Sequence, residues 1–145
     1  MERFIFYANL LKSNYFCGKM IYRREGNMKL LYANNKIEKV CNDTKSAIRK
    51  YGDKVGKNLS DLILLLQNVS SLMQIKKIPQ YRLYALKGNR KNQYAIVITF
   101  GSKYRLIIYP LDEKENIVAC GENENYMLST IKIIKIMEVS EHYEI

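Results

Sequence analysis

The chain contains one histidine, His142, close to its C-terminal end, and Tyr143 follows it. An imidazole has an ordinary pKa of about 6.5, so it can accept or give a proton near neutral pH. A tyrosine ring can stack on an unpaired nucleobase. The less specific alternatives are a solvated tail for His142 and packing on a sheet edge for Tyr143.

Several cations lie in the second half of the chain. Arg105 occupies the middle of an alternating run, where a charge is not expected to point into a core, and a guanidinium can hold two phosphate oxygens at once. Lys87, Arg90 and Lys91 belong to a predicted hairpin connection and could contact phosphates, although a charged hairpin is commonly only solvated. Arg82 is a weaker candidate of the same kind.

No metal or nucleotide site is expected. Cys17, Cys41 and Cys120 are widely spaced, no Cys-x-x-Cys or His-x-x-x-His occurs, and no glycine-rich phosphate loop is present. We therefore predict no cofactor, no metal ligands and reduced thiols. That pattern fits a cytoplasmic protein.

The charge balance favours a polyanionic partner. Twenty-four Lys and Arg against 14 Asp and Glu give a formal charge of +10, which concentrates nucleic acid or an acidic membrane near the surface. The apolar run from Phe4 to Leu11 is shorter than the roughly 20 residues that a membrane span needs. We expect neither an export signal nor a membrane partner.

Residues 1–27 differ from the rest of the chain because their apolar residues follow no clear period. Arg23-Arg24-Glu25-Gly26 can be encoded by purines alone, as a translated ribosome-binding site would be, and Met28 follows it. Two interpretations stay open: an extension upstream of a true start at Met28, or an arm that packs on the domain formed by residues 28–145.

The remaining chain predicts a strand, two helices and four strands. Helical periodicity covers Asn35 to Tyr51 and about Asp53 to Ser70, with Gly52 between them. Strands are expected at Lys29–Ala33, Tyr81–Leu86, Tyr94–Phe100, Tyr104–Tyr109 and Ile131–Val139, and a loop at Pro110–Thr130. This order predicts an α+β domain whose antiparallel-rich sheet packs against a helical hairpin. Tyrosines interleaved with the cations predict a basic sheet face with stacking rings, namely Tyr81, Tyr84, Tyr94 and Tyr104.

Three segments in this order resemble the HigB-like branch of the RelE/ParE toxin superfamily. They are Arg82-Leu83-Tyr84-Ala85-Leu86-Lys87-Gly88-Asn89-Arg90-Lys91-Asn92-Gln93-Tyr94, Tyr104-Arg105-Leu106-Ile107-Ile108 and Glu141-His142-Tyr143. The resemblance covers about Met28 to Tyr143. It implies a RelE-like βααβββ(β) domain that cuts messenger RNA in the ribosomal A site and is neutralised by an antitoxin encoded in an adjacent gene.

The resemblance also implies roles for individual residues. His142, Arg105, Tyr143 and Lys87 become candidate catalytic residues, and Arg82, Tyr84, Arg90 and Lys91 become candidate RNA-binding residues. Tyr84 occupies a position where the family often has a histidine. A tyrosine ordinarily keeps its proton at neutral pH, so Tyr84 is better suited to stacking or hydrogen bonding than to proton transfer.

The leading hypothesis is thus a ribosome-dependent, metal-independent mRNA endoribonuclease toxin of a type II toxin-antitoxin system. One alternative is a ParE-like poison of DNA gyrase, although such poisons generally lack the His-Tyr pair present here at His142 and Tyr143. Another is a binding module that has lost catalysis, which Tyr84 favours and Arg105 disfavours. The expected partners are a helix-turn-helix antitoxin, messenger RNA and the ribosome.

Overall fold

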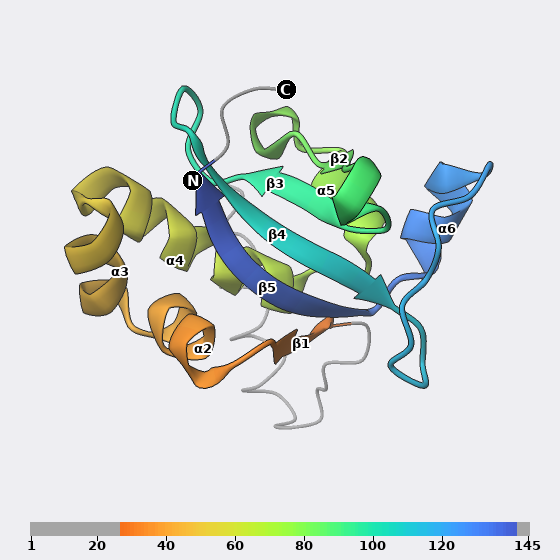
Figure 1. Ribbon diagram of the computed structural model, residues 1–145, viewed down its shortest axis with the longest axis horizontal. Helices are drawn as coiled ribbons and strands as arrows, with labels where there is room; N and C mark the ends of the chain where they lie inside the picture. The colour runs from red at the N-terminus through yellow and green to blue at the C-terminus, as the bar shows by residue number, and fades with distance from the viewer. Residues whose placement is uncertain (1–26, 142–145) are drawn as a thin grey trace, which may run out of the picture.

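A computed structural model describes residues 27–141 as an α+β domain (Figure 1). The helices are α2 (Asn35–Asn42), α3 (Thr44–Tyr51), α4 (Asp53–Asn68), α5 (Leu72–Lys76) and α6 (Glu124–Thr130). The strands are β1 (Lys29–Tyr32), β2 (Tyr84–Ala85), β3 (Tyr94–Val97), β4 (Tyr104–Leu111) and β5 (Ile133–Glu141). Two short 3-10 helices, η2 (Pro79–Tyr81) and η3 (Gly88–Arg90), flank β2.

The strands form one mixed sheet in the order β1-β5-β4-β3-β2. β1 pairs with β5 in parallel, and the other neighbouring strands pair antiparallel. A strand is followed by the helices α2 to α5 and then by four further strands, with α6 between β4 and β5. This order is consistent with the predicted RelE-like arrangement. The expected α+β class and antiparallel-rich sheet are therefore confirmed.

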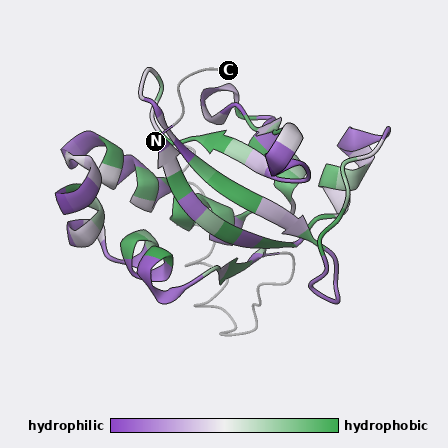
Figure 2. Ribbon diagram, viewed as in Figure 1, coloured by the Kyte–Doolittle hydropathy of each residue, from purple (hydrophilic) through white to green (hydrophobic). Residues whose placement is uncertain are grey.

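The core lies between α4 and one face of the sheet, and α4 runs behind β4 and β5 in Figure 1. Leu59, Leu62 and Leu66 of α4 are fully buried in the same cluster as Leu106 and Ile108 of β4. Figure 2 shows apolar residues along the strands and polar residues on the outside of α2 and α3. The helical periodicity thus predicted the correct buried stripe for α4.

The first predicted helix is interrupted, which corrects the expectation of one helix over Asn35–Tyr51. Asp43 has an extended backbone, ends α2 and caps α3 by accepting hydrogen bonds from Lys45 N and Ser46 Oγ. An aspartate can end one helix and begin the next because its carboxylate satisfies backbone N–H groups that lack a helical partner.

Two further expectations about local structure were wrong. Only Tyr84 and Ala85 of the predicted strand Tyr81–Leu86 pair in the sheet, since η2 and a left-handed Arg82 precede them. The predicted loop Pro110–Thr130 ends in α6, which buries Leu128 against the core. A helix this short shows little periodicity, so it is easily read as loop.

β5 contains an irregularity that decides which of its side chains face the core. Ile107 pairs with Glu138 whereas Ile108 pairs with Ile136, so Met137 is an extra residue in β5. This bulge reverses the alternation of the strand. Ile136 faces the core before it, and Val139 packs on the core after it.

Candidate nucleic-acid interface

The sheet face turned away from α4, called here the outer face, carries several of the predicted site residues. Tyr84, Ala95, Ile107 and Glu138 lie in register as one row across four strands. Val97, Arg105 and Ser140 form the next row on the same face. The register therefore brings Tyr84 and Arg105 to neighbouring rows, two residues apart along the strands.

Arg105 is partly buried and is anchored to the turn that precedes β4. Its Nη1 donates to the carbonyl oxygen of Ser102 at 2.6 Å and to that of Tyr104 at 3.1 Å. Its Nε is buried and has no hydrogen-bond partner among the described residues. Two carbonyl acceptors hold the guanidinium at the end of the outer face, which is the preorganisation that electrostatic stabilisation of a phosphate requires.

The connection between β2 and β3 brings three more predicted cations to this face or its edge. Lys87 and Lys91 flank η3 and are exposed. Arg90, between them, donates from Nη1 to Gln93 Oε1 at 2.9 Å and from Nη2 to Glu138 Oε2 at 2.8 Å. Arg90 was predicted to bind RNA, and in this structure its charge is already paired.

Arg82 and Tyr84 lie together at the β2 edge of the sheet. The Arg82 guanidinium carbon is 5.3 Å from the centroid of the Tyr84 ring, within the range of a cation–π contact. Arg82 has a left-handed backbone with φ of 38°, which is uncommon for a residue with a side chain. The pair combines an exposed cation with a partly buried ring.

His142 and Tyr143 lie outside the residues that the structure describes. β5 ends at Glu141, which pairs with Tyr104, and Ser140 pairs with Arg105. In sequence, both predicted residues follow Glu141, which is one residue beyond the partner of Arg105 in β5.

Three of the four predicted stacking tyrosines do not belong to this face. Tyr94 is 1% exposed and Tyr81 is 9% exposed, and both belong to the hydrophobic core cluster. Tyr104 also packs against that cluster from the helix-covered side. The expectation of four interleaved stacking rings was wrong because the alternation of β3 turns Tyr94 inward, opposite to Ala95.

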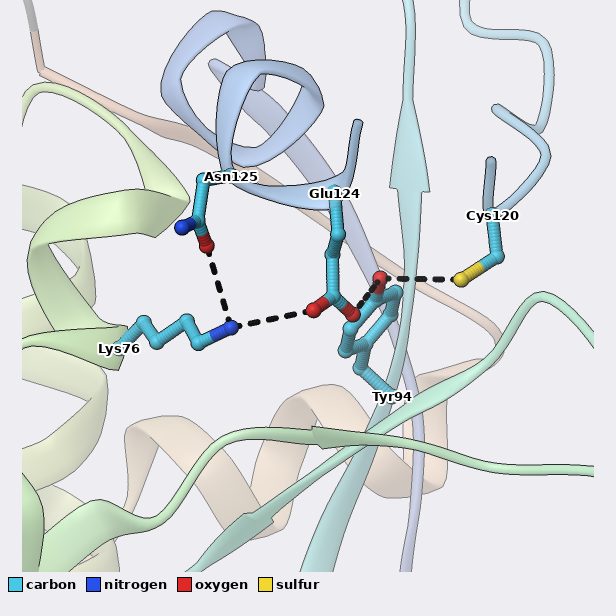
Figure 3. Close-up of polar contacts among 5 residues, drawn as sticks. All are labelled: Lys76, Tyr94, Cys120, Glu124 and Asn125. Carbon is cyan, nitrogen blue, oxygen red and sulfur yellow. Dashed lines mark hydrogen bonds and ion pairs between the residues drawn. The ribbon is translucent and has the colours of Figure 1, made fainter. Parts of the chain in front are cut away.

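A polar cluster that the sequence did not predict lies around Tyr94 on the helix-covered side (Figure 3). The Tyr94 hydroxyl donates to Glu124 Oε2 at 2.8 Å and lies 3.3 Å from Cys120 Sγ. Lys76 Nζ donates to Glu124 Oε1 at 3.0 Å and to Asn125 Oδ1 at 3.2 Å. These contacts join α5, α6 and β3, so the cluster fixes the fold at the end of the domain that carries α6.

The electrostatics of this cluster follow from its contacts. Burial, followed by the hydrogen bonds to Cys120 and Glu124, raises the pKa of Tyr94 well above its ordinary value. The hydrogen bond from Tyr94 and the interactions with Lys76 hold the pKa of Glu124 below its usual value. Tyr94 is therefore a neutral donor and Glu124 an ionised acceptor at neutral pH.

The two cysteines in the described part of the chain are free. Burial raises the pKa of the Cys41 thiol to about 12, whereas Cys120 is exposed. Within residues 27–141, no three His, Cys, Asp or Glu side chains come together as metal ligands. No helix in that range is long and apolar enough to cross a membrane.

Comparison with family models, with curated proteins and with solved structures found no match to this chain. The resemblance to the RelE/ParE superfamily therefore rests on the residues quoted above and on the order of the elements.

Proposed function

We propose that this chain is the toxin of a type II toxin-antitoxin system and acts as a ribosome-dependent, metal-independent mRNA endoribonuclease. The observation that carries the proposal is Arg105, anchored on the outer face of a RelE-like sheet in the row next to Tyr84. The formal charge of +10 supports a nucleic-acid substrate.

The proposed reaction is a transesterification within the messenger RNA. His142 takes the proton of a ribose 2′-hydroxyl, the 2′-oxygen forms a bond to the adjacent phosphorus, and the bond from phosphorus to the 5′-oxygen breaks. A protonated group gives its proton to the leaving 5′-oxygen, so the products are a 2′,3′-cyclic phosphate and a free 5′-hydroxyl. Arg105 stabilises the extra negative charge on the phosphorane.

The other candidate residues bind and position the RNA. Lys87 and Lys91 are exposed and suited to flanking phosphates, and Tyr143 to stacking on a base. Tyr84, with Arg82 over its ring, is suited to hydrogen bonding or stacking. A helix-turn-helix antitoxin encoded beside this gene would cover the basic surface, in a complex that salt weakens.

The test is single-turnover cleavage of messenger RNA on programmed ribosomes. Wild type should leave 2′,3′-cyclic phosphate ends, and His142→Gln should cut roughly a hundredfold more slowly while still binding ribosomes. If His142→Gln cuts as fast as wild type, the histidine is not the proton-transfer group. If wild type never cuts but inhibits supercoiling by DNA gyrase, the endoribonuclease proposal fails and the gyrase-poison alternative replaces it.

A further inference from the structure

The turn between β3 and β4, residues 98–103 and here named the Phe100 hairpin, carries the most exposed large apolar side chain of the described residues. Phe100 is 87% exposed, compared with 65% for Tyr126, 51% for Ile117 and 45% for Leu64. One exposed phenylalanine is not by itself a binding site. Phe100 is a candidate because hydrogen bonds support its turn and because lysines and tyrosines lie close to that turn.

Hydrogen bonds tie the Phe100 hairpin to its neighbours. Ser102 N donates to Thr99 O at 3.0 Å, and Arg105 Nη1 donates to Ser102 O at 2.6 Å. Asn58 of α4 donates from Nδ2 to Thr99 Oγ1 at 2.9 Å, which ties the turn to the helical layer. Gly101 supplies the positive φ of 85° that the turn requires. These bonds reduce the backbone ordering that binding to the ring would require.

The surroundings of the hairpin are basic and aromatic. The rings of Tyr51 and Tyr104 meet edge to face, with centroids 5.1 Å apart, which joins the end of α3 to the start of β4. Lys50 Nζ lies 5.7 Å from the Tyr51 ring and Lys103 Nζ 5.7 Å from the Tyr104 ring.

Among residues 27–141, lysines outnumber carboxylates at this end of the domain. Asp53 and Glu141 are acidic residues at this end, and each is engaged by a lysine, Lys57 and Lys103 respectively. Lys50 and Lys54 add further exposed cations close to the start of α4. The hairpin and the C-terminal end of β5 lie at this same end (Figure 1).

We propose that Phe100 is a stacking platform for an unpaired base of single-stranded RNA, whose phosphates are attracted by the surrounding lysines. One flat ring among cations fits a base and its backbone, because single-stranded RNA sites combine aromatic rings with positive charge. A protein partner would call for a larger contiguous apolar patch. The proposal names a binding element of the nuclease proposed above and rests on that function for its biological substrate.

The chain has no tryptophan, so the variant Phe100→Trp introduces a single fluorescent reporter at the tip of the hairpin. The probes are an eight-nucleotide oligoadenylate, inorganic polyphosphate of similar charge, and phosphatidylserine vesicles. We expect oligoadenylate to quench the fluorescence of this reporter saturably and polyphosphate to leave it nearly unchanged, because only the former has bases. Leu64→Trp, on the outside of α4, is the matched control and should not be quenched.

A second variant tests the affinity itself. Phe100→Ala should weaken oligoadenylate binding by roughly tenfold and leave polyphosphate binding unchanged, since stacking on one aromatic ring contributes about that much. Its thermal midpoint should match that of wild type, because the side chain is exposed. Unchanged oligoadenylate affinity, or binding without quenching, would overturn the proposal. A spectral blue shift with vesicles and no response to oligoadenylate would also overturn it, in favour of a membrane surface.

These measurements need no ribosome, so they separate this proposal from the nuclease proposal. If oligoadenylate quenches the Phe100→Trp reporter but the protein never cuts ribosome-bound messenger RNA, the stacking platform stands and the nuclease proposal fails. If the protein cuts messenger RNA but the reporter does not respond to oligoadenylate, the nuclease proposal stands and the stacking platform fails.

Discussion

Arg90 Nη2 lies 2.8 Å from Glu138 Oε2, an ion pair that connects the β2–β3 connection to β5. β4 lies between these elements in the sheet, so the pair reaches across the outer face. Ala95 and Ile107, in the same row as Glu138, are only 1% and 3% exposed. Because of the bulge at Met137, Glu138 points to this face and not into the core.

This pairing predicts that the three cations around η3 differ in their contribution to RNA binding. Lys87→Gln and Lys91→Gln should each weaken oligoribonucleotide binding and reduce its salt dependence, because each removes an exposed charge. Arg90→Gln should weaken binding less, since Glu138 already neutralises Arg90. The dissociation constants of the three variants, measured over a range of salt concentrations, test this ranking.

A control separates charge from local structure in that series. Glu138→Gln leaves the Arg90 charge without its carboxylate partner and should tighten RNA binding, at a stability cost of about 0 to 1 kcal/mol for a half-exposed pair. If Arg90→Gln weakens binding more than Lys87→Gln does, Arg90 leaves Glu138 to contact RNA and the predicted ranking is wrong.

Acid should destabilise the domain through Glu124. The folded pKa of this carboxyl is lowered from 4.5 by the hydrogen bond from Tyr94 and by Lys76. Its contribution to stability is therefore present above pH 4.5 and is lost as the pH falls through the lower folded pKa. Urea unfolding between about pH 3 and pH 6 should show a smaller loss for Glu124→Gln than for wild type. If both proteins lose the same free energy of unfolding, a group other than Glu124 causes the acid sensitivity.

Alkali should destabilise the domain through Tyr94. The folded pKa of this phenol is raised above 10.0, so its contribution is present below that pH and is lost as the pH rises toward the folded pKa. Tyr94→Phe should unfold more easily at neutral pH, by about 1 to 2 kcal/mol, because it removes a donor to an ionised acceptor. Its stability should then fall less steeply between about pH 9 and pH 11.

Tyr51 provides a comparison for that measurement, because burial raises the pKa of this tyrosine as well. Tyr51→Phe should retain the alkaline loss that depends on Tyr94. If Tyr94→Phe and wild type lose stability in parallel above about pH 9, the phenol of Tyr94 is not the group responsible.

The sequence predicted the fold class because long periodic segments report burial directly. The stripe of α4 and the apolar, β-rich runs of β3 and β4 were strong enough to predict the sheet and its helical cover. The break at Asp43 was missed because Ile37, Cys41 and Ala47 continue to face the core on both sides of it. Apolar spacing alone does not reveal a change of backbone direction between two helices that bury the same side.

The candidate site was harder to predict because it depends on tertiary pairing. The sequence showed that tyrosines and cations are interleaved, but only the register distinguishes Tyr84 on the outer face from Tyr94 in the core. Glu138 is in phase with Ile134 and Ile136, so simple alternation would turn it inward. The bulge that reverses this leaves no clear mark in the sequence.

Gly56 should be intolerant of substitution even though it lies inside a helix. A Cβ at this position would come within 2.6 Å of the backbone N and Cα of Ile48, where α3 and α4 touch. Gly56→Ala should therefore destabilise the domain by about 1 to 3 kcal/mol, although alanine is the better helix former. Thermal unfolding measures the effect.

Asp61→Ala, at an exposed position of the same helix, is the matched control. It should leave the thermal midpoint within about 1 or 2 °C of wild type, because surface substitutions have small effects. A neutral or stabilising Gly56→Ala would mean that the two helices can move apart without loss.

Arg105 connects the structural and the catalytic parts of the proposal, so its substitution needs two readouts. Arg105→Ala removes the donor to Ser102 O and Tyr104 O and should cost about 1 to 3 kcal/mol of stability. If Arg105 also stabilises the phosphorane, single-turnover cleavage should fall by roughly 10² to 10³, measured at a temperature where both proteins are fully folded. Arg105→Lys keeps the charge but has no planar fork to hold both carbonyl groups and a phosphate.

The comparison between these two variants decides the role of Arg105. We expect Arg105→Lys to bind oligoribonucleotide nearly as well as wild type and yet to cut roughly tenfold more slowly or worse, because geometry as well as charge is needed in the transition state. Asn58→Ala is the control, since it releases the same turn through Thr99 without changing any charge. If Asn58→Ala slows cleavage as much as Arg105→Ala does, Arg105 acts by positioning the hairpin. If only the arginine variants are slow, its guanidinium acts on the phosphate itself.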